Sequence, residues 1–186
     1  MRTLPDIIKA DLAAVVCGVA VPCSADRGHY YAGQGNSFWQ LLHDSGLTSS
    51  RLTPEADDSL PELGLGLGLV DLVPADGNGG SIDVPSFIAL MAEHRPRWVA
   101  FNGKKAGDAL ARALGHTKPG LGEQDWTIVG ARVFVLPSSS GANRRRDYDG
   151  RPDRLQWWAE LAELVRTACG GQHSGTAISP RRSQSS

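Results

Sequence analysis

Four short segments of the sequence carry side chains that could do chemistry, and each coincides with or follows a run of apolar residues. The segments read CGVAVPCSADRGHYYAGQGN, GLVDLV, FNGKKAG and LPSSSGANRRR. Together they hold aromatic rings, a carboxylate, an amide, several glycines and a basic loop. Apolar runs of this kind predict buried strands, so we expect the four segments at strand ends, where parallel sheets bind ligands.

Asp71 is the acidic residue that we expect to face a ligand, because it stands near the end of the apolar run LGLGLGLVDLV. Asp26, in the first loop, is the other acid of the four segments. An ionised carboxylate at a strand end could orient and activate a water molecule, with general-base assistance worth about 10² to 10⁴ in rate. An aspartate after a strand also often caps a backbone turn, and this alternative stays open.

Asn102 follows the apolar run of the third segment and precedes a predicted helix start. Its amide could pair with the donor and acceptor edge of a nucleobase, or it could cap the helix. Lys104 could meet a phosphate, although lysines at such positions are more commonly solvated. His29, beside a pair of tyrosines, is interpreted as a loop histidine rather than a catalyst.

The loop SSSGANRRR combines small hydroxyl residues with three consecutive arginines at 144–146. Small residues let backbone N–H groups approach phosphates, and arginines add charge and a forked donor geometry. Asp147, Asp149 and Asp153 stand nearby and could neutralise the arginines in a surface ion-pair cluster. Phosphate binding and mutual neutralisation both remain open at this point.

Strands and helices are predicted to alternate along the chain. The strand-like runs are Ala13–Val21, Leu65–Val73, Trp98–Phe101 and Thr127–Leu136, the last broken by Gly130 into a hairpin. The helical patterns cover 36–46 with Asn36 as N-cap, Pro85–His94, Lys104–Leu114 and Asp153–Ala168, with a short helix after Thr53. Strands that are apolar on both faces predict an α/β fold, a three-layer α/β/α sandwich around a mainly parallel sheet of four to five strands.

The composition narrows the class of protein. With 186 residues, of which 41% are hydrophobic, we expect one domain over 1–169 and a disordered polar tail over 170–186. Nineteen Lys and Arg against twenty Asp and Glu exclude an overall basic character, so any nucleic acid must meet a local patch. The three cysteines lack ligand spacing, so we expect no metal or cofactor. No apolar stretch reaches the roughly 20 residues that span a membrane, and a cytoplasmic protein is expected.

In this order, the segments resemble the uracil-DNA glycosylase superfamily, and in particular its mismatch-specific uracil and thymine branch, from about Ala13 to Trp158. GHYYAGQGNSFWQLL resembles the family's aromatic loop and Asn-x-Phe-Trp helix, and LGLGLGLVDLV its second strand. PRWVAFNGKKA resembles its third strand and next helix, and LPSSSG its DNA-penetrating loop. The resemblance implies the same sandwich fold and a monofunctional DNA glycosylase that flips out uracil from G:U mismatches. It would act without a cofactor, as a monomer at the nucleoid, on duplex or single-stranded DNA.

The resemblance also implies which residues bind DNA. Tyr31 would stack on the extruded base, and the base-binding set would be Tyr31, Gly18, Ala20, Asn102 and Ser138. The set that contacts the rest of the DNA would be Ser139, Ser140, Gly141, Ala142, Asn143, Arg144, Arg145 and Lys104. The family's wedge position, which fills the hole left by the base, aligns with Ala142, whose side chain is too small. Asn143 or Arg144 would then substitute, or mismatches and single strands would be preferred.

One position departs from the family pattern. The first strand of this branch typically ends in Gly-Ile-Asn-Pro-Gly, whose Asn positions the hydrolytic water, whereas CGVAVP places Ala20 there. Cleavage of an N-glycosidic bond develops positive charge on the sugar and negative charge on the base. We therefore expect Asp71 to replace the missing Asn. Two alternatives stay open: a glycosylase for hypoxanthine, xanthine or another damaged base, and a non-catalytic module that binds damaged DNA or a nucleotide.

Overall fold

The computed structural model describes residues 4–20, 25–72 and 82–170. Val21 and Val73, the last residues of the first two predicted strands, lie outside these ranges. So do residues 171–186 of the predicted tail, whereas Gly170 ends a helix.

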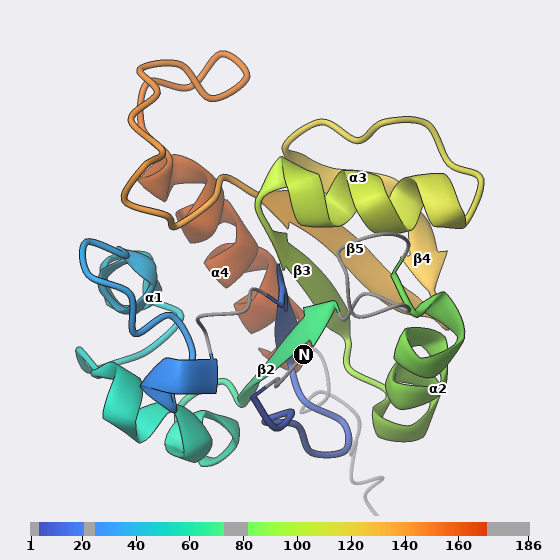
Figure 1. The fold of residues 1–186 in the computed structure, drawn as a ribbon, viewed down its shortest axis with the longest axis horizontal. Helices are drawn as coiled ribbons and strands as arrows, with labels where there is room; N and C mark the ends of the chain where they lie inside the picture. Colours follow the sequence, from blue (N-terminus) through green and yellow to red (C-terminus); the bar gives the residue numbers. More distant parts are fainter. Residues whose placement is uncertain (1–3, 21–24, 73–81, 171–186) are drawn as a thin grey trace, which may run out of the picture.

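Five strands form one sheet with the order β2-β1-β3-β5-β4 (Figure 1). The strands are β1 (Ala14–Val19), β2 (Leu67–Leu72), β3 (Trp98–Asn102), β4 (Gly122–Ile128) and β5 (Ala131–Leu136). All neighbours are parallel except β4 and β5, which are antiparallel and joined at Gly130. This confirms the mainly parallel sheet and places a strand on each side of the predicted hairpin turn.

The hairpin's first strand begins at Gly122, earlier than the predicted start at Thr127. The prediction looked for a continuous apolar run, which is typical of strands buried on both faces. β4 is one of the two edge strands of the sheet, and its side chains alternate between buried and exposed positions. Its sequence, GEQDWTI, therefore contains no continuous apolar run, and the search for such runs missed this strand.

Helices cover both faces of the sheet, as Figure 1 shows. They are α1 (Phe38–Asp44), α2 (Val84–His94), α3 (Lys104–Ala113) and α4 (Leu155–Gly170), with 3₁₀ helices η1 (Ala25–Arg27) and η2 (Pro54–Glu62). The apolar side chains of α1, η2 and α4 form one core cluster with one face of the sheet, and those of α2 and α3 form a second with the other face. The three-layer α/β/α sandwich is confirmed.

The predicted N-cap of the first helix needs a correction. Ser37 occupies the N-cap position of α1, while the Asn36 side chain accepts a hydrogen bond from the Phe38 N–H at 3.0 Å. Asn36 thus satisfies a donor of the first turn from one residue further out.

Strand register brings the predicted functional segments to one edge of the sheet. Gly18 of β1 lies opposite Asp71 of β2, and Asn102 of β3 lies opposite Leu136 of β5. Each of these residues ends or nearly ends its strand, so the following loops meet at the carboxyl edge, where open α/β sheets bind ligands.

Candidate active site

A cavity of about 370 Å³ opens at the carboxyl edge of the sheet. Its wall includes eight of the site residues predicted from the sequence: Gly18, Tyr31, Asp71, Asn102, Lys104, Ser138, Ser139 and Ser140. Ala20 does not line this cavity; its side chain is buried and its N–H donates to the Leu72 carbonyl at 3.0 Å. The structure therefore gathers most of the predicted base-binding set in one cavity and leaves Ala20 out.

Asp71 places its carboxyl group at the cavity wall. Burial, with a smaller contribution from the charge of Asp6, raises its pKa from 3.8 to about 6. Among the described residues no hydrogen bond reaches the carboxylate. Residues 73–81, which follow β2, lie outside the described ranges, so the turn-capping alternative stays open. A carboxylate with this pKa is largely ionised near neutral pH and can accept a proton.

Gly18 allows two functional groups to approach the same strand. A side chain at this position would begin 2.5 Å from Asp71 Oδ1 and 2.9 Å from the Tyr31 hydroxyl oxygen, closer than real contacts allow. The two oxygens therefore converge above the Gly18 backbone. Glycine is required here because of this close approach.

Tyr31 is held in an unusual backbone conformation. Its φ is 55°, a region that non-glycine residues adopt rarely and mainly where surrounding structure enforces it. One face of its ring stacks on Phe38, with centroids 3.9 Å apart and planes inclined by 21°. The ring is thus fixed on one side before any ligand enters.

The Tyr31 hydroxyl is buried and has no hydrogen-bond partner among the described residues. Burial, followed by the charge of Asp71, raises its pKa above the ordinary value of 10.0. The Asn102 amide opposes this rise, but the two groups make no hydrogen bond of acceptable geometry. The hydroxyl therefore stays protonated at physiological pH.

Asp57, which sequence reasoning missed, fixes the loop that carries Tyr31. Its carboxylate is buried on η2, accepts a hydrogen bond from the Tyr30 N–H at 2.9 Å and lies 3.2 Å from His29 Nδ1. The Trp39 indole N–H donates to the Tyr30 carbonyl at 3.1 Å. Because Asp57 lies 27 residues from Tyr30 in the chain, no local pattern reveals the contact.

Asn102 ties the end of β3 to the loop after β5. Its Nδ2 donates to Ser139 Oγ at 2.8 Å, and its Oδ1 accepts from the Ser139 N–H at 2.9 Å. One N–H and one lone pair of the amide remain for a ligand. The helix-capping alternative is wrong, because Gly103 is the N-cap of α3 and no side-chain cap bond forms there.

Arg154, also missed by sequence reasoning, holds the loop after β5 in place. Its guanidinium donates to the carbonyls of Ser138 and Ser140 at 3.2 and 3.3 Å, and to Ser37 Oγ at 2.8 Å. Gly141 lies directly against the Gly35 carbonyl, with no room for a side chain. The loop is thereby anchored to the start of α1.

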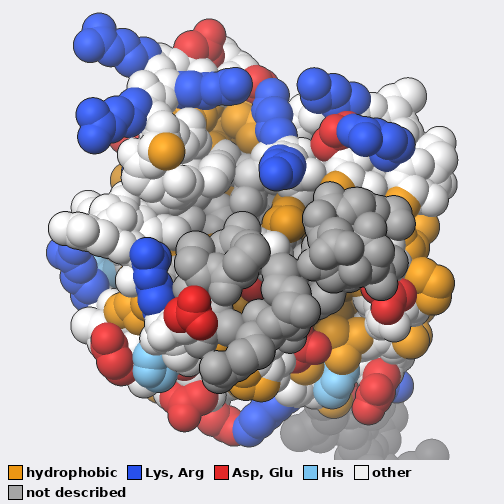
Figure 2. Space-filling view, in the orientation of Figure 1, with side chains coloured by type: hydrophobic (Ala, Val, Ile, Leu, Met, Phe, Trp, Pro, Cys, Tyr) orange, Lys and Arg blue, Asp and Glu red, His pale blue; other side chains and the backbone are white. Residues whose placement is uncertain are grey.

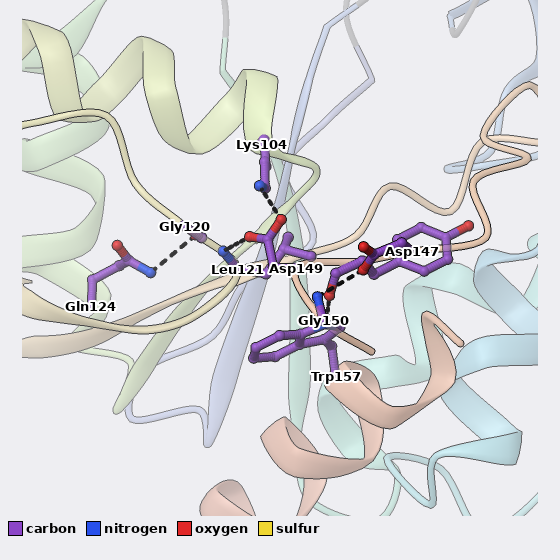
Figure 3. Close-up of polar contacts among 9 residues, drawn as sticks. Lys104, Gly120, Leu121, Gln124, Asp147, Asp149, Gly150 and Trp157 are labelled. Carbon is purple, nitrogen blue, oxygen red and sulfur yellow. Dashed lines mark hydrogen bonds and ion pairs between the residues drawn. The ribbon is translucent and has the colours of Figure 1, made fainter. Parts of the chain in front are cut away.

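Lys104 is half-buried and forms an ion pair with Asp149, as Figure 3 shows. Its Nζ lies 2.6 Å from Asp149 Oδ1, and Asp149 Oδ2 accepts the Leu121 N–H at 3.0 Å. The Asp147 carboxylate accepts the Gly150 N–H at 2.7 Å in the same turn. The hydrogen bond from Lys104 holds the pKa of Asp149 below its usual value. Asp147 and Asp149 thus both already have hydrogen-bond partners.

The arginines at 144–146 are exposed, and none of them forms an ion pair with a described residue. Asp153, the third nearby acid, accepts the Leu155 N–H at 2.9 Å. The surface ion-pair cluster considered from the sequence therefore does not form among the described residues, although the charge of Arg145 contributes to the lowered pKa of Asp149. Figure 2 shows Lys and Arg side chains gathered along the margin that carries this loop and α3. Ala142 is exposed, and Asn143 donates to the Ser138 carbonyl, which leaves Arg144 the freer of the two predicted wedge substitutes.

Within the described ranges, no group of three His, Cys, Asp or Glu side chains could hold a metal ion. No helix in those ranges is both long and apolar enough to cross a membrane.

A sequence model of the uracil DNA glycosylase superfamily matches residues 5–162. The chain belongs to the uracil DNA glycosylase superfamily. The match spans all five strands and every predicted site segment. Members of this superfamily are DNA glycosylases, which hydrolyse N-glycosyl bonds of DNA in base excision repair, so this protein is a DNA glycosylase and DNA is its partner. The mismatch-specific branch stays a prediction.

Proposed function

We propose that this glycosylase flips out a deaminated base, in the first place uracil opposite guanine, and that Asp71 activates the water that hydrolyses the glycosidic bond. The observation that carries this proposal is the partly buried Asp71 carboxylate, which has no hydrogen-bond partner among the described residues and stands at the wall of a base-sized cavity that Tyr31 also lines. The position of the usual amide is taken by Ala20, outside the cavity wall.

The proposed step breaks the bond between the sugar C1′ and the base nitrogen, and the bonding electrons leave with the base. The water oxygen forms the new bond to C1′, and one water proton passes to Asp71. That proton then reaches the departed base through solvent. In the transition state the ionised carboxylate also stabilises the cationic sugar, because opposite charges attract strongly in a buried site.

Two side chains support recognition of the base in this proposal. The face of Tyr31 opposite Phe38 would stack on the extruded ring. The free N–H and free lone pair of the Asn102 amide match one acceptor and one donor of a uracil edge. A purine such as hypoxanthine also presents one donor and one acceptor on its edge. The Asn102 contact therefore does not determine which base is preferred, and the cleavage assay below measures that preference.

The basic loop would hold the DNA backbone beside the cavity. Arg144 and Arg145 are exposed and unpaired within the described part of the chain, so their guanidinium groups are available to phosphates. Arg144 is the proposed wedge. We further propose that the enzyme is monofunctional, since Asp71 activates water and the amine of Lys104 is engaged by Asp149.

The test is a panel of labelled duplexes that carry one G:U, A:U, G:T, hypoxanthine or xanthine site, with single-stranded uracil DNA alongside. We expect strand breaks at the lesion, fastest with G:U and only after alkali. Breaks before alkali would contradict monofunctional action. Faster cleavage of hypoxanthine or xanthine would replace the proposed substrate. Binding to lesions without any cleavage would show a non-catalytic module.

A further inference from the structure

The space above Gly18 is bounded by two oxygen atoms that have no hydrogen-bond partner among the described residues. Asp71 Oδ1 and the Tyr31 hydroxyl oxygen lie 2.5 and 2.9 Å from the point where a side chain at position 18 would begin. Two oxygens that close to one point are less than about 6 Å apart, a span that a single water bridges with two hydrogen bonds of about 2.8 Å. Both groups line the cavity.

We propose that the Tyr31 hydroxyl is a positioning group for the attacking water, which sits above Gly18 between this hydroxyl and the Asp71 carboxylate. This inference rests on the proposed function, since it takes Asp71 as the base. In this proposal the Tyr31 hydroxyl positions the water, in addition to the stacking of its ring on the base.

The hydrogen-bonding capacities of the three groups match this arrangement. The water donates one O–H to Asp71 and accepts the O–H of Tyr31, which leaves its second lone pair free to attack the sugar carbon. The Tyr31 hydroxyl acts as the donor because its environment keeps it protonated. A buried hydroxyl without any partner is costly, and a bridging water supplies the partner that Tyr31 lacks.

The titratable groups around Asp71 do not replace this contact. Asp6 raises the pKa of Asp71 by charge repulsion, and Cys17 is buried on the neighbouring strand with its thiol directed to the Gly18 carbonyl. Tyr30 also has a buried hydroxyl without a partner in the described part of the chain, but this hydroxyl is not among the atoms nearest to Gly18. Of these groups, Tyr31 alone shares the position 18 space with Asp71.

Tyr31→Phe tests the proposal, because it removes the hydroxyl and keeps the ring that stacks on Phe38. We expect the single-turnover rate on the best lesion of the panel to fall about tenfold, the effect of losing one positioning hydrogen bond. Affinity for a duplex with a 2′-fluorinated, cleavage-resistant nucleotide should change less than twofold. The acid limb of the pH–rate profile should move to higher pH, because the ionised carboxylate loses the hydrogen-bonded water that stabilises it.

A double-mutant cycle and a matched control separate this role from a structural one. If Tyr31 acts through the water bound to Asp71, Tyr31→Phe should have almost no effect in an Asp71→Asn background. Tyr30→Phe removes the neighbouring buried hydroxyl and should cost less than twofold. Gly18→Ala, which fills the shared space, should lower the rate at least as much as Tyr31→Phe.

The outcomes distinguish this inference from the function on which it rests. Wild-type protein that cleaves no lesion overturns the proposed function and this role together. Active wild-type protein with an equally active Tyr31→Phe variant overturns the role alone. So does an equal loss in Tyr30→Phe, or a tenfold effect of Tyr31→Phe that persists without the Asp71 carboxylate.

Discussion

Replacing Asp71 by Asn should separate activity from stability, because the two depend on the carboxylate with opposite sign. Asn has nearly the same shape but carries no charge and cannot accept the proton of the attacking water. We expect the single-turnover rate at about pH 7 to fall by about 10² to 10⁴, the range for general-base assistance. Binding to a cleavage-resistant lesion duplex should stay within a factor of about three.

The pH profile of the wild-type enzyme follows from the same group. With the pKa of Asp71 near 6, about nine-tenths of the enzyme is ionised at about pH 7 and about one-tenth at about pH 5. The single-turnover rate should therefore drop about tenfold between these values. The residual rate of Asp71→Asn should lack this limb.

Stability should change in the opposite direction. In the folded protein the pKa of Asp71 is raised from 3.8 to about 6, so over this window the native state holds a proton that the unfolded chain has released. The resulting cost is absent below about pH 4 and reaches about 3 kcal/mol above about pH 6. The unpaired Asn amide costs about 1 to 2 kcal/mol, so the variant should be more stable by about 1 to 2 kcal/mol at about pH 7.

Two assays check this prediction: single-turnover cleavage across pH, and urea unfolding at about pH 4 and about pH 7. Asp58→Asn, at an exposed aspartate beside η2's buried acid, is the matched control and should change neither quantity. A rate loss below tenfold for Asp71→Asn, or an acid limb that survives in the variant, would refute the assigned role. A variant that is less stable at about pH 7 would refute the argument from burial.

Two further predictions concern the groups around the cavity. The double variant Arg144→Gln and Arg145→Gln should weaken DNA binding and reduce the slope of log affinity against log salt by about 1.8. The control is the same double change at Arg95 and Arg112, which lie at the C-terminal ends of α2 and α3, at the edge of the sheet opposite the cavity. This control should leave the slope unaltered. Equal slopes in all three proteins would show that the loop arginines do not touch phosphate. Asp57→Asn should lower the free energy of unfolding by about 1 to 3 kcal/mol and also slow cleavage, because its carboxylate fixes the loop before Tyr31. Urea unfolding measures the first effect and single-turnover kinetics measure the second. An unchanged cleavage rate would show that cleavage does not depend on the contacts that Asp57 makes with this loop.

Much of the fold could be predicted from local patterns. Long apolar runs identified β1, β2 and β3, since a strand covered by helices on both faces carries few polar side chains. The same criterion missed most of β4, whose outer face is solvated at the sheet edge. Helix starts were placed within about two residues, the usual uncertainty where caps and first turns merge.

The sequence by itself determined which chemical groups are available near the strand ends: the carboxylate of Asp71, the amide of Asn102, the ring of Tyr31 and the arginines at 144–146. These follow from residue type and from position relative to an apolar run, which are local properties. Their order along the chain also indicated the superfamily, which the match over residues 5–162 confirmed.

Only the tertiary structure decided how these groups interact. Strand register set Gly18 against Asp71, and the fold of a separate loop brought the Tyr31 hydroxyl to the same place. Asp57 and Arg154 fix the surrounding loops through contacts that span 27 and up to 117 residues of chain. Register and long-range contacts depend on packing of the whole sheet and its helices, so no stretch of sequence read alone contains them.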